Sequence, residues 1–346
     1  MAENGSIQDP KAVVSIIYGF ALSRITATFV RLGIPDQLAD AEKSADGLAA
    51  ATGCHPDALR RLLRVGVVIG LLSLENGRFR LTPLGQTLRT DAPSAAGHLA
   101  AMYSSPPVQA AWAALEQSVR TGRTAFEIAN GVPLFEWLER DPELARHFHA
   151  AMAAVTRNQL PGLCERYDFS GLRRVVDVGG GDGTLLAAIL TENAGLRGTV
   201  FDTDKAVETA PEVLARAGVA GRCDIVTGDF FLEVPAGADA YLLKNILHDW
   251  DDESCRTILR NCRRVMGNEA KILAVTSLLS GEEEASDSMQ TEFAAYLDIE
   301  MLVMTGGRER TLCQYEQLFA DADLRLGDVT ELPGAPGGFV VEALPA

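Results

Sequence analysis

Apolar runs that alternate with amphipathic stretches fill the carboxyl-terminal half of the chain. The first of them, VVDVGGGDGTLLAAIL at 175–190, predicts a strand, a glycine turn and a helix. Four more short apolar strands are predicted, at 196–201, 223–227, 238–245 and 271–277. Strands that alternate with helices predict an α/β domain with an open, mostly parallel sheet.

The amino-terminal pattern is different. Residues 11–32 are predicted to form an amphipathic helix that ends at Gly33. Two short helices, at 46–52 and 56–69, precede two alternating runs joined by an Asn76-Gly77 turn. This order is typical of a winged-helix domain, and the residues that follow read as helical. We therefore expect a winged-helix domain at 1–95, a helical connector at 96–170 and the sheet domain at 171–346.

Composition and charge exclude several classes of protein. The 346 residues are enough for about two domains, and 47% of them are hydrophobic. A formal net charge of −16 disfavours nucleic-acid binding through phosphates. The sequence has no run of 18 or more apolar residues, so we expect no membrane span. Its amino terminus lacks a basic region followed by an apolar one, so we expect no secretory signal peptide. The six cysteines form no C-x-x-C pair, so we expect reduced thiols in a cytoplasmic protein, without a metal site.

Arginines keep one DNA-binding alternative open. Arg60, Arg61 and Arg64 lie on the second short helix, and Arg78 and Arg80 lie in the hairpin. The same short helix carries the apolar residues of a packed helix, so its arginines also fit an ordinary solvated face. A role in dimerisation is the favoured interpretation.

The glycine turn after the first strand is the main ligand signal. The dinucleotide fingerprint is met at Gly179 and Gly181 but has Thr184 at its last position. Asp177 and Asp182 flank the turn and would repel a pyrophosphate, whereas a cationic ligand would be favoured. The turn therefore favours S-adenosylmethionine, and NAD and a bare structural turn remain open.

Polar residues at the ends of the later strands add to this signal. Asp202 lies about 20 residues beyond the turn, where a carboxylate can accept ribose hydroxyls. Asp229 and Phe230 follow the third strand and suit an adenine ring. His248 follows the fourth strand, at the edge where open α/β sheets bind ligands. By itself, this histidine fits a structural role as well as a catalytic one.

Four segments, VVDVGGGDGTL, GDFF, LLKNILHDWDDESCRTILRNCRRVM and GGRERT, occur in this order. With these segments, nearly the whole chain resembles the S-adenosylmethionine-dependent small-molecule O-methyltransferases of the caffeic acid and hydroxyindole type, which include bacterial antibiotic-tailoring enzymes. The resemblance implies a Rossmann-like class I methyltransferase domain with a seven-stranded, mostly parallel sheet. It also implies a homodimer formed through the amino-terminal helices, and a small aromatic substrate.

The resemblance implies a role for each matching residue. His248 would be the general base, and Glu309 would orient its imidazole. The cofactor-binding set comprises Asp177, Gly179, Gly181, Asp202, Asp229, Phe230, Lys244 and Trp250. The substrate-facing set comprises Phe148, Met152, Glu300, Met301 and Thr305. No metal is expected, and the product of the cofactor would be S-adenosylhomocysteine.

The chain departs from the family pattern in three places. Thr276 occupies a position near the end of the fifth strand where the family commonly has a second carboxylate beside the histidine. Thr203 and Asp204 replace the usual Leu-Pro after Asp202. Glu300 stands where an apolar residue is usual, and it fits a substrate contact, a substitute acid or a solvent-facing residue.

Three hypotheses follow from the sequence. The first is O-methylation of a phenolic or enolic hydroxyl on an aromatic secondary metabolite. The second keeps the cofactor but uses it for pericyclic, decarboxylation or hydroxylation chemistry. The third is a winged-helix regulator that binds DNA or a ligand.

Overall fold

The computed structural model describes residues 10–280, 289–332 and 338–346, which form two compact units. The first unit comprises residues up to 109 together with 138–154, and the second comprises 110–137 and the chain from 155 onward. Residues 1–9, on which the prediction of no export leader partly rests, lie outside the described residues.

The first unit contains the predicted long helix, two short helices and hairpin, each within one residue of its expected bounds, whereas α2 and α5 were not predicted. Its elements are α1 (Pro10–Arg31), α2 (Ile34–Gln37), β1 (Lys43–Ser44), α3 (Ala45–Thr52), α4 (Pro56–Val68), β2 (Leu72–Glu75), β3 (Arg78–Leu81), α5 (Pro83–Gln86) and α6 (Ala96–Tyr103). The short strand β1, which the sequence did not predict, pairs with β3 and makes a three-stranded antiparallel sheet. Phe29, Leu48 and Leu63 are fully buried in the core beneath it.

Helix α1 exposes most of its apolar side chains. Ile16, Ile17 and Phe20 are 77%, 67% and 68% exposed, and α1 packs against α6. Among the described residues, α1 is the one helix that is long and apolar enough to cross a membrane, with a mean hydropathy of 1.7 over Ala12–Arg31. The expectation that no segment spans a membrane considered only uninterrupted apolar runs. The length and composition of α1 do not support that expectation.

Residues 106–166, which precede the first strand of the sheet, are helical, as predicted. It holds α7 (Pro106–Ala113), α8 (Leu115–Thr121), α9 (Ala125–Asn130), α10 (Leu134–Arg140) and α11 (Pro142–Arg166). Within the second unit, α8 and α9 pack against α15 (Met289–Met304).

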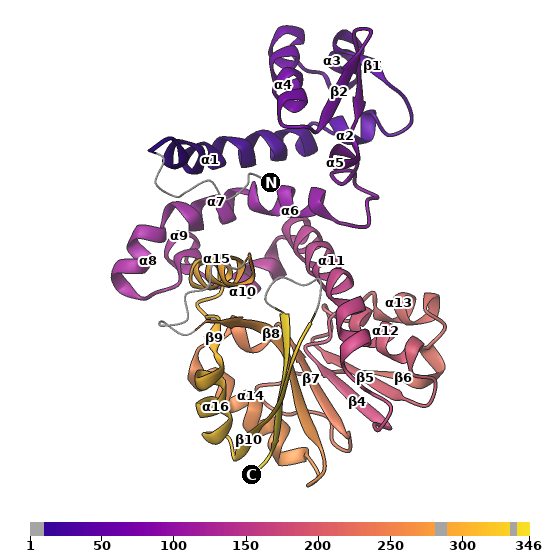
Figure 1. The fold of residues 1–346 in the computed structure, drawn as a ribbon, viewed down its shortest axis with the longest axis vertical. Coiled ribbons are helices and arrows are strands. Elements are labelled where there is room, and N and C mark those ends of the chain that lie inside the picture. The colour runs from indigo at the N-terminus through magenta and orange to yellow at the C-terminus, as the bar shows by residue number, and fades with distance from the viewer. Residues whose placement is uncertain (1–9, 281–288, 333–337) are drawn as a thin grey trace. The chain divides into compact units, whose positions relative to one another are not determined.

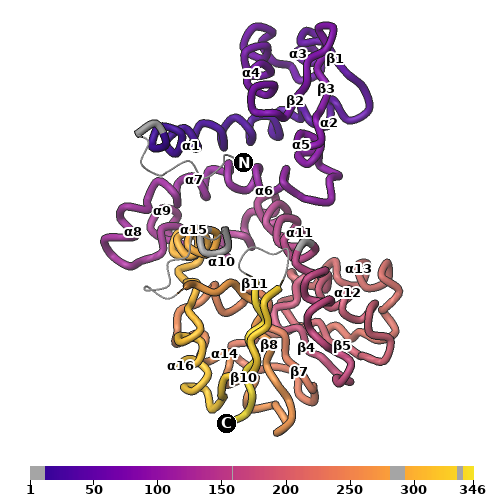
Figure 2. The backbone as a smooth tube through the Cα atoms, viewed as in Figure 1, coloured from indigo at the N-terminus to yellow at the C-terminus, as the bar shows by residue number. Residues whose placement is uncertain are grey.

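The second unit is built on the predicted sheet. Its seven main strands are β4 (Arg174–Val178), β5 (Arg197–Asp202), β6 (Cys223–Thr227), β7 (Ala240–Lys244), β8 (Lys271–Leu279), β10 (Leu324–Glu331) and β11 (Gly338–Pro345). Their order is β10-β11-β8-β7-β4-β5-β6, and β9 (Arg310–Thr311) adds a short parallel pairing at the end of β8. Strands β4 to β8 are parallel, and the last two strands extend the sheet beyond β8 in antiparallel fashion. Figure 2 shows β10 and β11 next to each other beside β8. This confirms the seven-stranded, mostly parallel prediction.

Side chains of one strand alternate between two cores, as the period of two requires. Tyr241 and Leu243 face one core, while Leu242 faces the other. Figure 1 shows α14 (Asp252–Val265) and α16 (Leu312–Ala320) along one face of the sheet, and α12 (Thr184–Glu192) and α13 (Ala210–Arg216) along the other. The direction of the strand order reverses between β4 and β7, which places the ligand crevice at the carboxyl ends of these strands.

Candidate active site

His248 and Glu309 form a buried pair at the carboxyl edge of the sheet. His248 is 8% exposed and Glu309 is 1% exposed. The imidazole Nδ1 lies 2.7 Å from Glu309 Oε1. Because an ionised carboxylate only accepts hydrogen bonds, Nδ1 carries the proton and Nε2 is left as the acceptor. This arrangement is that of a general base held by a carboxylate.

The local fold places His248 just beyond β7. The buried strand ends at Lys244, and Asn245 follows with a φ of 54°, which turns the chain away from the sheet. A short 3₁₀ helix, η2 (Leu247–Asp249), carries the histidine. Asp251 then caps α14 by accepting a hydrogen bond of 2.8 Å from the Ser254 N–H. A strand end, a single turn and a capped helix therefore fix the position of the imidazole.

A second carboxylate, which the sequence analysis missed, lies on the other side of the ring. Asp249 Oδ1 is 3.9 Å from His248 Nε2. Burial lowers the pKa of His248, but the charge of Asp249 and the hydrogen bond and charge of Glu309 outweigh burial and raise it above the usual value. Burial in turn raises the pKa of Asp249 to about 6, although the charge of His248 opposes this. The signal was available, because Asp249 directly follows the histidine in the H-D-W motif.

Thr276 forms a hydroxyl pair where an acid was expected. It is 5% exposed, and its Oγ1 lies 3.0 Å from the hydroxyl of Tyr315, which is fully buried. Asp249 instead places a second carboxylate near the imidazole, from the loop of the histidine itself.

Helix α15 carries two of the predicted substrate residues, Glu300 and Met301, and a third, Thr305, follows it directly. Met301 is buried, and Glu300 is half-buried with its charge raising the pKa of Asp249. Thr305 follows the helix and its Oγ1 accepts a hydrogen bond of 3.3 Å from the Gly307 N–H. The same helix supplies Asp298, whose Oδ1 accepts a hydrogen bond of 3.0 Å from the Glu309 N–H. Glu300 therefore lies near enough to Asp249 for its charge to affect that carboxyl.

The glycine turn lies beside the ends of β4 and β5. The Gly179 N–H donates to the Phe201 carbonyl at 2.8 Å, and the Gly181 N–H donates to Asp202 Oδ2 at 2.9 Å. Gly179 has a φ of 73°, and a Cβ there would lie 2.3 Å from Ile246 Cδ1. Only glycine allows this loop to pass so close to the chain that leads to His248.

The charges around the turn fit a cationic ligand. Asp177 is 1% exposed, and its Oδ2 has no hydrogen-bond partner among the described residues. Burial and the charge of Asp202 raise the pKa of Asp177 to about 7. Burial lowers the pKa of Lys244 to about 8, against the charges of Asp177 and Asp249. A ligand with positive charge would relieve this carboxylate, whereas a pyrophosphate would worsen its position.

The predicted adenine residues join an aromatic cluster. The rings of Phe231 and Trp250 lie 4.8 Å apart, and Phe135 stacks on Trp250 at 5.6 Å. Phe230 lies 4.9 Å from Phe231, and its ring also reaches the space beside Gly179. Asp229 is exposed, and its Oδ1 accepts a hydrogen bond of 2.8 Å from the Phe231 N–H. The cluster connects the glycine turn with the histidine loop.

Two predicted substrate residues belong to the other unit. Phe148 and Met152 are half-buried on the part of α11 that lies in the first unit. Their role therefore stays a prediction. Across the described ranges, no group of three histidine, cysteine or acidic side chains is arranged to hold a metal ion.

Comparison with known proteins gives a consistent result. The profile of the O-methyltransferase domain matches residues 112–325, and that of the O-methyltransferase dimerisation domain matches residues 14–91. The phenazine O-methyltransferase of Lysobacter antibioticus is 39% identical, over the full length of both chains.

Solved structures agree with these matches. A crystal structure of LaPhzM superposes with a TM-score of 0.91 and 38% identity, covering 97% of this chain and 99% of the other. The O-methyltransferase NcsB1 of neocarzinostatin biosynthesis, in complex with S-adenosylmethionine and 2-hydroxy-5-methyl naphthoic acid, gives 0.80 and 32%, covering 94% and 96%. The length and strength of these matches show that the chain belongs to the O-methyltransferase family.

Proposed function

We propose that the chain is an S-adenosylmethionine-dependent O-methyltransferase that acts on a phenolic or enolic hydroxyl of a small aromatic secondary metabolite. The observation that carries this proposal is the buried His248–Glu309 pair, 2.7 Å apart, on the same sheet edge as the glycine turn. A relative with 39% identity is named as a phenazine O-methyltransferase, and the structure of another similar protein was solved in complex with a naphthoic acid. These names favour a planar aromatic substrate.

His248 would take the proton of the substrate hydroxyl at Nε2. A phenol has a pKa of about 10, so it is a poor nucleophile until its proton begins to leave. Glu309 and Asp249 stabilise the positive imidazole that forms, because both carboxylates lie within 4 Å of the ring. General-base assistance of this kind contributes about 10²–10⁴ in rate. The bound cofactor supplies an electrophilic methyl group on a good leaving group.

The remaining residues would position the two reactants. We propose that Asp177, Gly179, Gly181 and Asp202 hold the methionine and ribose parts of the cofactor. Asp229, Phe230, Lys244 and Trp250 would surround the adenine. The proposed substrate-facing set is Phe148, Met152, Glu300, Met301 and Thr305. Correct orientation of two reactants can lower a barrier by roughly 7–11 kcal/mol.

Replacing the base tests this proposal. We expect His248→Ala to lower kcat by about 10²–10⁴ while S-adenosylhomocysteine binds with unchanged affinity in calorimetry. The rate is followed as S-adenosylhomocysteine formed with a panel of phenols, naphthols and phenazines. An unchanged rate in the variant would remove His248 from the mechanism.

Chemistry without methyl transfer is the weaker alternative. The relative and the crystal structures described above include named O-methyltransferases. Equal amounts of methylated product and S-adenosylhomocysteine support methyl transfer, whereas product without S-adenosylhomocysteine supports the alternative.

DNA binding also loses support from the ion pairs of the first unit. Arg60 lies 2.7 Å from Asp46, and Arg80 lies 3.2 Å from Glu42. Glu42 also pairs with Arg78, at 3.8 Å. Acids thus offset the charge of three of the five arginines that suggested a nucleic-acid surface. A salt-sensitive shift of duplex DNA by the purified protein would revive this alternative.

We further propose that α1 buries its apolar face in a homodimer. We also propose a winged-helix domain at 1–95, a helical connector at 96–170 and a sheet domain at 171–346. A cytoplasmic location is proposed as well, and all six cysteines are free. Burying one isoleucine is worth about 1.5–3 kcal/mol, and a symmetric dimer buries it twice. Ile17→Asp should therefore weaken dimerisation at least 100-fold in sedimentation experiments. Ser15→Asp, on the opposite side of the helix, is the matched control, and membrane-vesicle binding by the wild type would contradict the assignment.

A further inference from the structure

Arg310 is a buried cation whose side chain reaches the histidine loop. It is 1% exposed and is the largest of the fully buried side chains of the described residues. Its guanidinium makes five hydrogen bonds, as many as it has N–H groups. Nε and Nη2 donate to Asp252 Oδ1 at 3.1 and 2.7 Å. Nη1 donates to the carbonyls of Leu247 and Arg308 at 2.7 and 3.4 Å, and Nη2 also donates to the Trp250 carbonyl at 2.9 Å.

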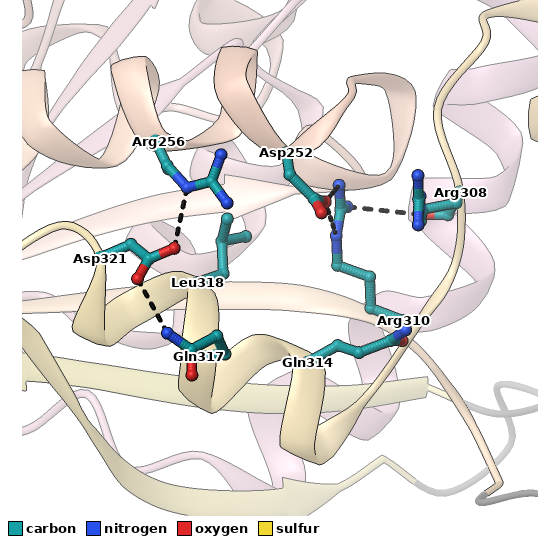
Figure 3. Close-up of a pocket in the computed structure, with 8 residues that line it drawn as sticks. All are labelled: Asp252, Arg256, Arg308, Arg310, Gln314, Gln317, Leu318 and Asp321. Carbon is teal, nitrogen blue, oxygen red and sulfur yellow. Dashed lines mark hydrogen bonds and ion pairs between the residues drawn. The ribbon is translucent and has the colours of Figure 1, made fainter.

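These acceptors lie on both sides of the proposed base. Leu247 precedes His248 and Trp250 follows it by two residues, so one planar group holds both ends of η2. Asp252 is the first residue of α14, which begins directly after this loop. In Figure 3 the Arg310 side chain points at Asp252, while Arg256 of the same pocket turns to Asp321 instead.

The main chain around Arg310 completes the same connection. The Arg308 N–H donates to the His248 carbonyl at 2.9 Å. Glu309, whose carboxylate meets the imidazole, is the neighbour of Arg310 in the chain. The segment 308–310 thus contacts the carbonyls of Leu247, His248 and Trp250, and it presents Glu309 to the ring at the same time.

We propose that Arg310 is a positioning residue for the methyl transfer, because its guanidinium sets the distance between His248 and Glu309. The inference rests on the proposed function. A lysine keeps the charge but has no planar group with which to serve these four separate acceptors. Arg310→Lys therefore loosens the pair without removing either member. A misplacement of about 1 Å can cost about 100-fold in rate.

The test compares Arg310→Lys with Arg256→Lys, a control from the same pocket whose arginine pairs with the surface acids Glu253 and Asp321. We expect Arg310→Lys to lower kcat about 10–100-fold, with KM and S-adenosylhomocysteine affinity changed less than about 3-fold. In a Glu309→Gln background the same change should cost less than about 3-fold, because the contact it supports is already weakened. Arg256→Lys should match the wild type.

A second readout does not depend on turnover. The chain has five histidines, so the imidazole of His248 can be titrated by NMR and assigned with a His248→Gln variant. The pKa of His248 should fall in Arg310→Lys and stay in Arg256→Lys. If Arg310→Lys does not fold, Asp252→Asn removes the carboxylate that holds the guanidinium and should lower the pKa of His248 in the same direction.

The outcomes separate the two proposals. A wild-type enzyme that methylates nothing overturns the proposed function, while the titration still tests Arg310. A wild type that methylates, together with an Arg310→Lys variant whose kcat lies within twofold of the control, overturns only the positioning role. The positioning role is also overturned if the kcat losses of Arg310→Lys and Glu309→Gln simply multiply in the double variant. An unchanged pKa of His248 in Arg310→Lys overturns it as well.

Discussion

Glu309→Gln isolates the charge that supports the base. The substitution keeps the size of the side chain and leaves an oxygen that can accept from His248 Nδ1. It removes the negative charge next to a ring that must become positive during proton transfer. The contact is short, 2.7 Å, and the Glu309 carboxylate is shielded from solvent, so water screens it little.

The size of the effect follows from this geometry. A hydrogen bond to a charged group contributes about 1.5–3 kcal/mol. Since about 1.4 kcal/mol is a factor of ten, kcat should fall roughly 10–150-fold. The pKa of His248 lies above its usual value, partly because of Glu309. A general base acts when neutral, so the acid limb of the kcat profile should lie above pH 6.5 in the wild type and move to lower pH in the variant.

The assay is the formation of S-adenosylhomocysteine under saturating substrate, from about pH 5 to pH 9. Glu309→Gln in a His248→Ala background serves as the control, because it should then cost nothing further. A single variant with kcat within twofold of the wild type and an unmoved acid limb would refute the reasoning. Loss of S-adenosylhomocysteine binding in the variant would refute it too, because Glu309 is assigned to the base and not to the cofactor.

Three further predictions come from other parts of the site. As the pH rises toward 7, cofactor affinity should increase up to tenfold per pH unit, because the pKa of Asp177 is raised to about 7 and a cation prefers the ionised carboxylate. Calorimetry checks this on the wild type and on Asp177→Asn, whose affinity should not depend on pH in this range. Gly307→Ala should lower kcat about 100-fold, because its Cβ would lie 2.0 Å from the His248 carbonyl oxygen, whereas Gly267→Ala, with open space around it, should keep the wild-type rate. Thr276→Val should reduce the free energy of unfolding by about 1–3 kcal/mol, since it leaves the buried Tyr315 hydroxyl unpaired, and should leave the acid limb in place; a shifted limb would show that the hydroxyl pair serves the base.

Periodicity was enough to predict most of the fold. The long helix, the two short helices and the hairpin of the first 82 residues were predicted to within one residue, because apolar spacing, Gly33 and the Asn76-Gly77 turn are local signals; the four-residue helix α2 was missed. Strands β1 and β9 were missed because each has two residues and exists only through its pairing with β3 or β8. A two-residue strand carries no periodic signal of its own.

The site was predictable where chemistry and local sequence coincide. His248 could be placed because it follows a buried strand, but its pairing with Glu309, 61 positions away, came from the family resemblance alone. Asp249 was not predicted, although it directly follows the histidine in the chain and lies 3.9 Å from its ring. Arg310 gave no signal, because a buried arginine and a solvated one look alike in a sequence until their acceptors are known.

The buried charges of the crevice lower the stability of the folded protein. Asp177 in β4 and Asp249 in the loop after the neighbouring strand β7 both have raised pKa values, and Lys244, whose charge lowers both of these values, has a lowered pKa itself. A carboxylate whose pKa is higher in the folded state than in the unfolded state favours folding while protonated, and this advantage is lost as the pH rises through the folded value near 7. Ionised Asp177 is therefore destabilising at and above neutral pH, and a cation bound beside it removes the penalty. If the cofactor binds here as proposed, part of its binding free energy would come from relieving this instability, which would account for a buried acid with one unpaired oxygen beside the glycine turn.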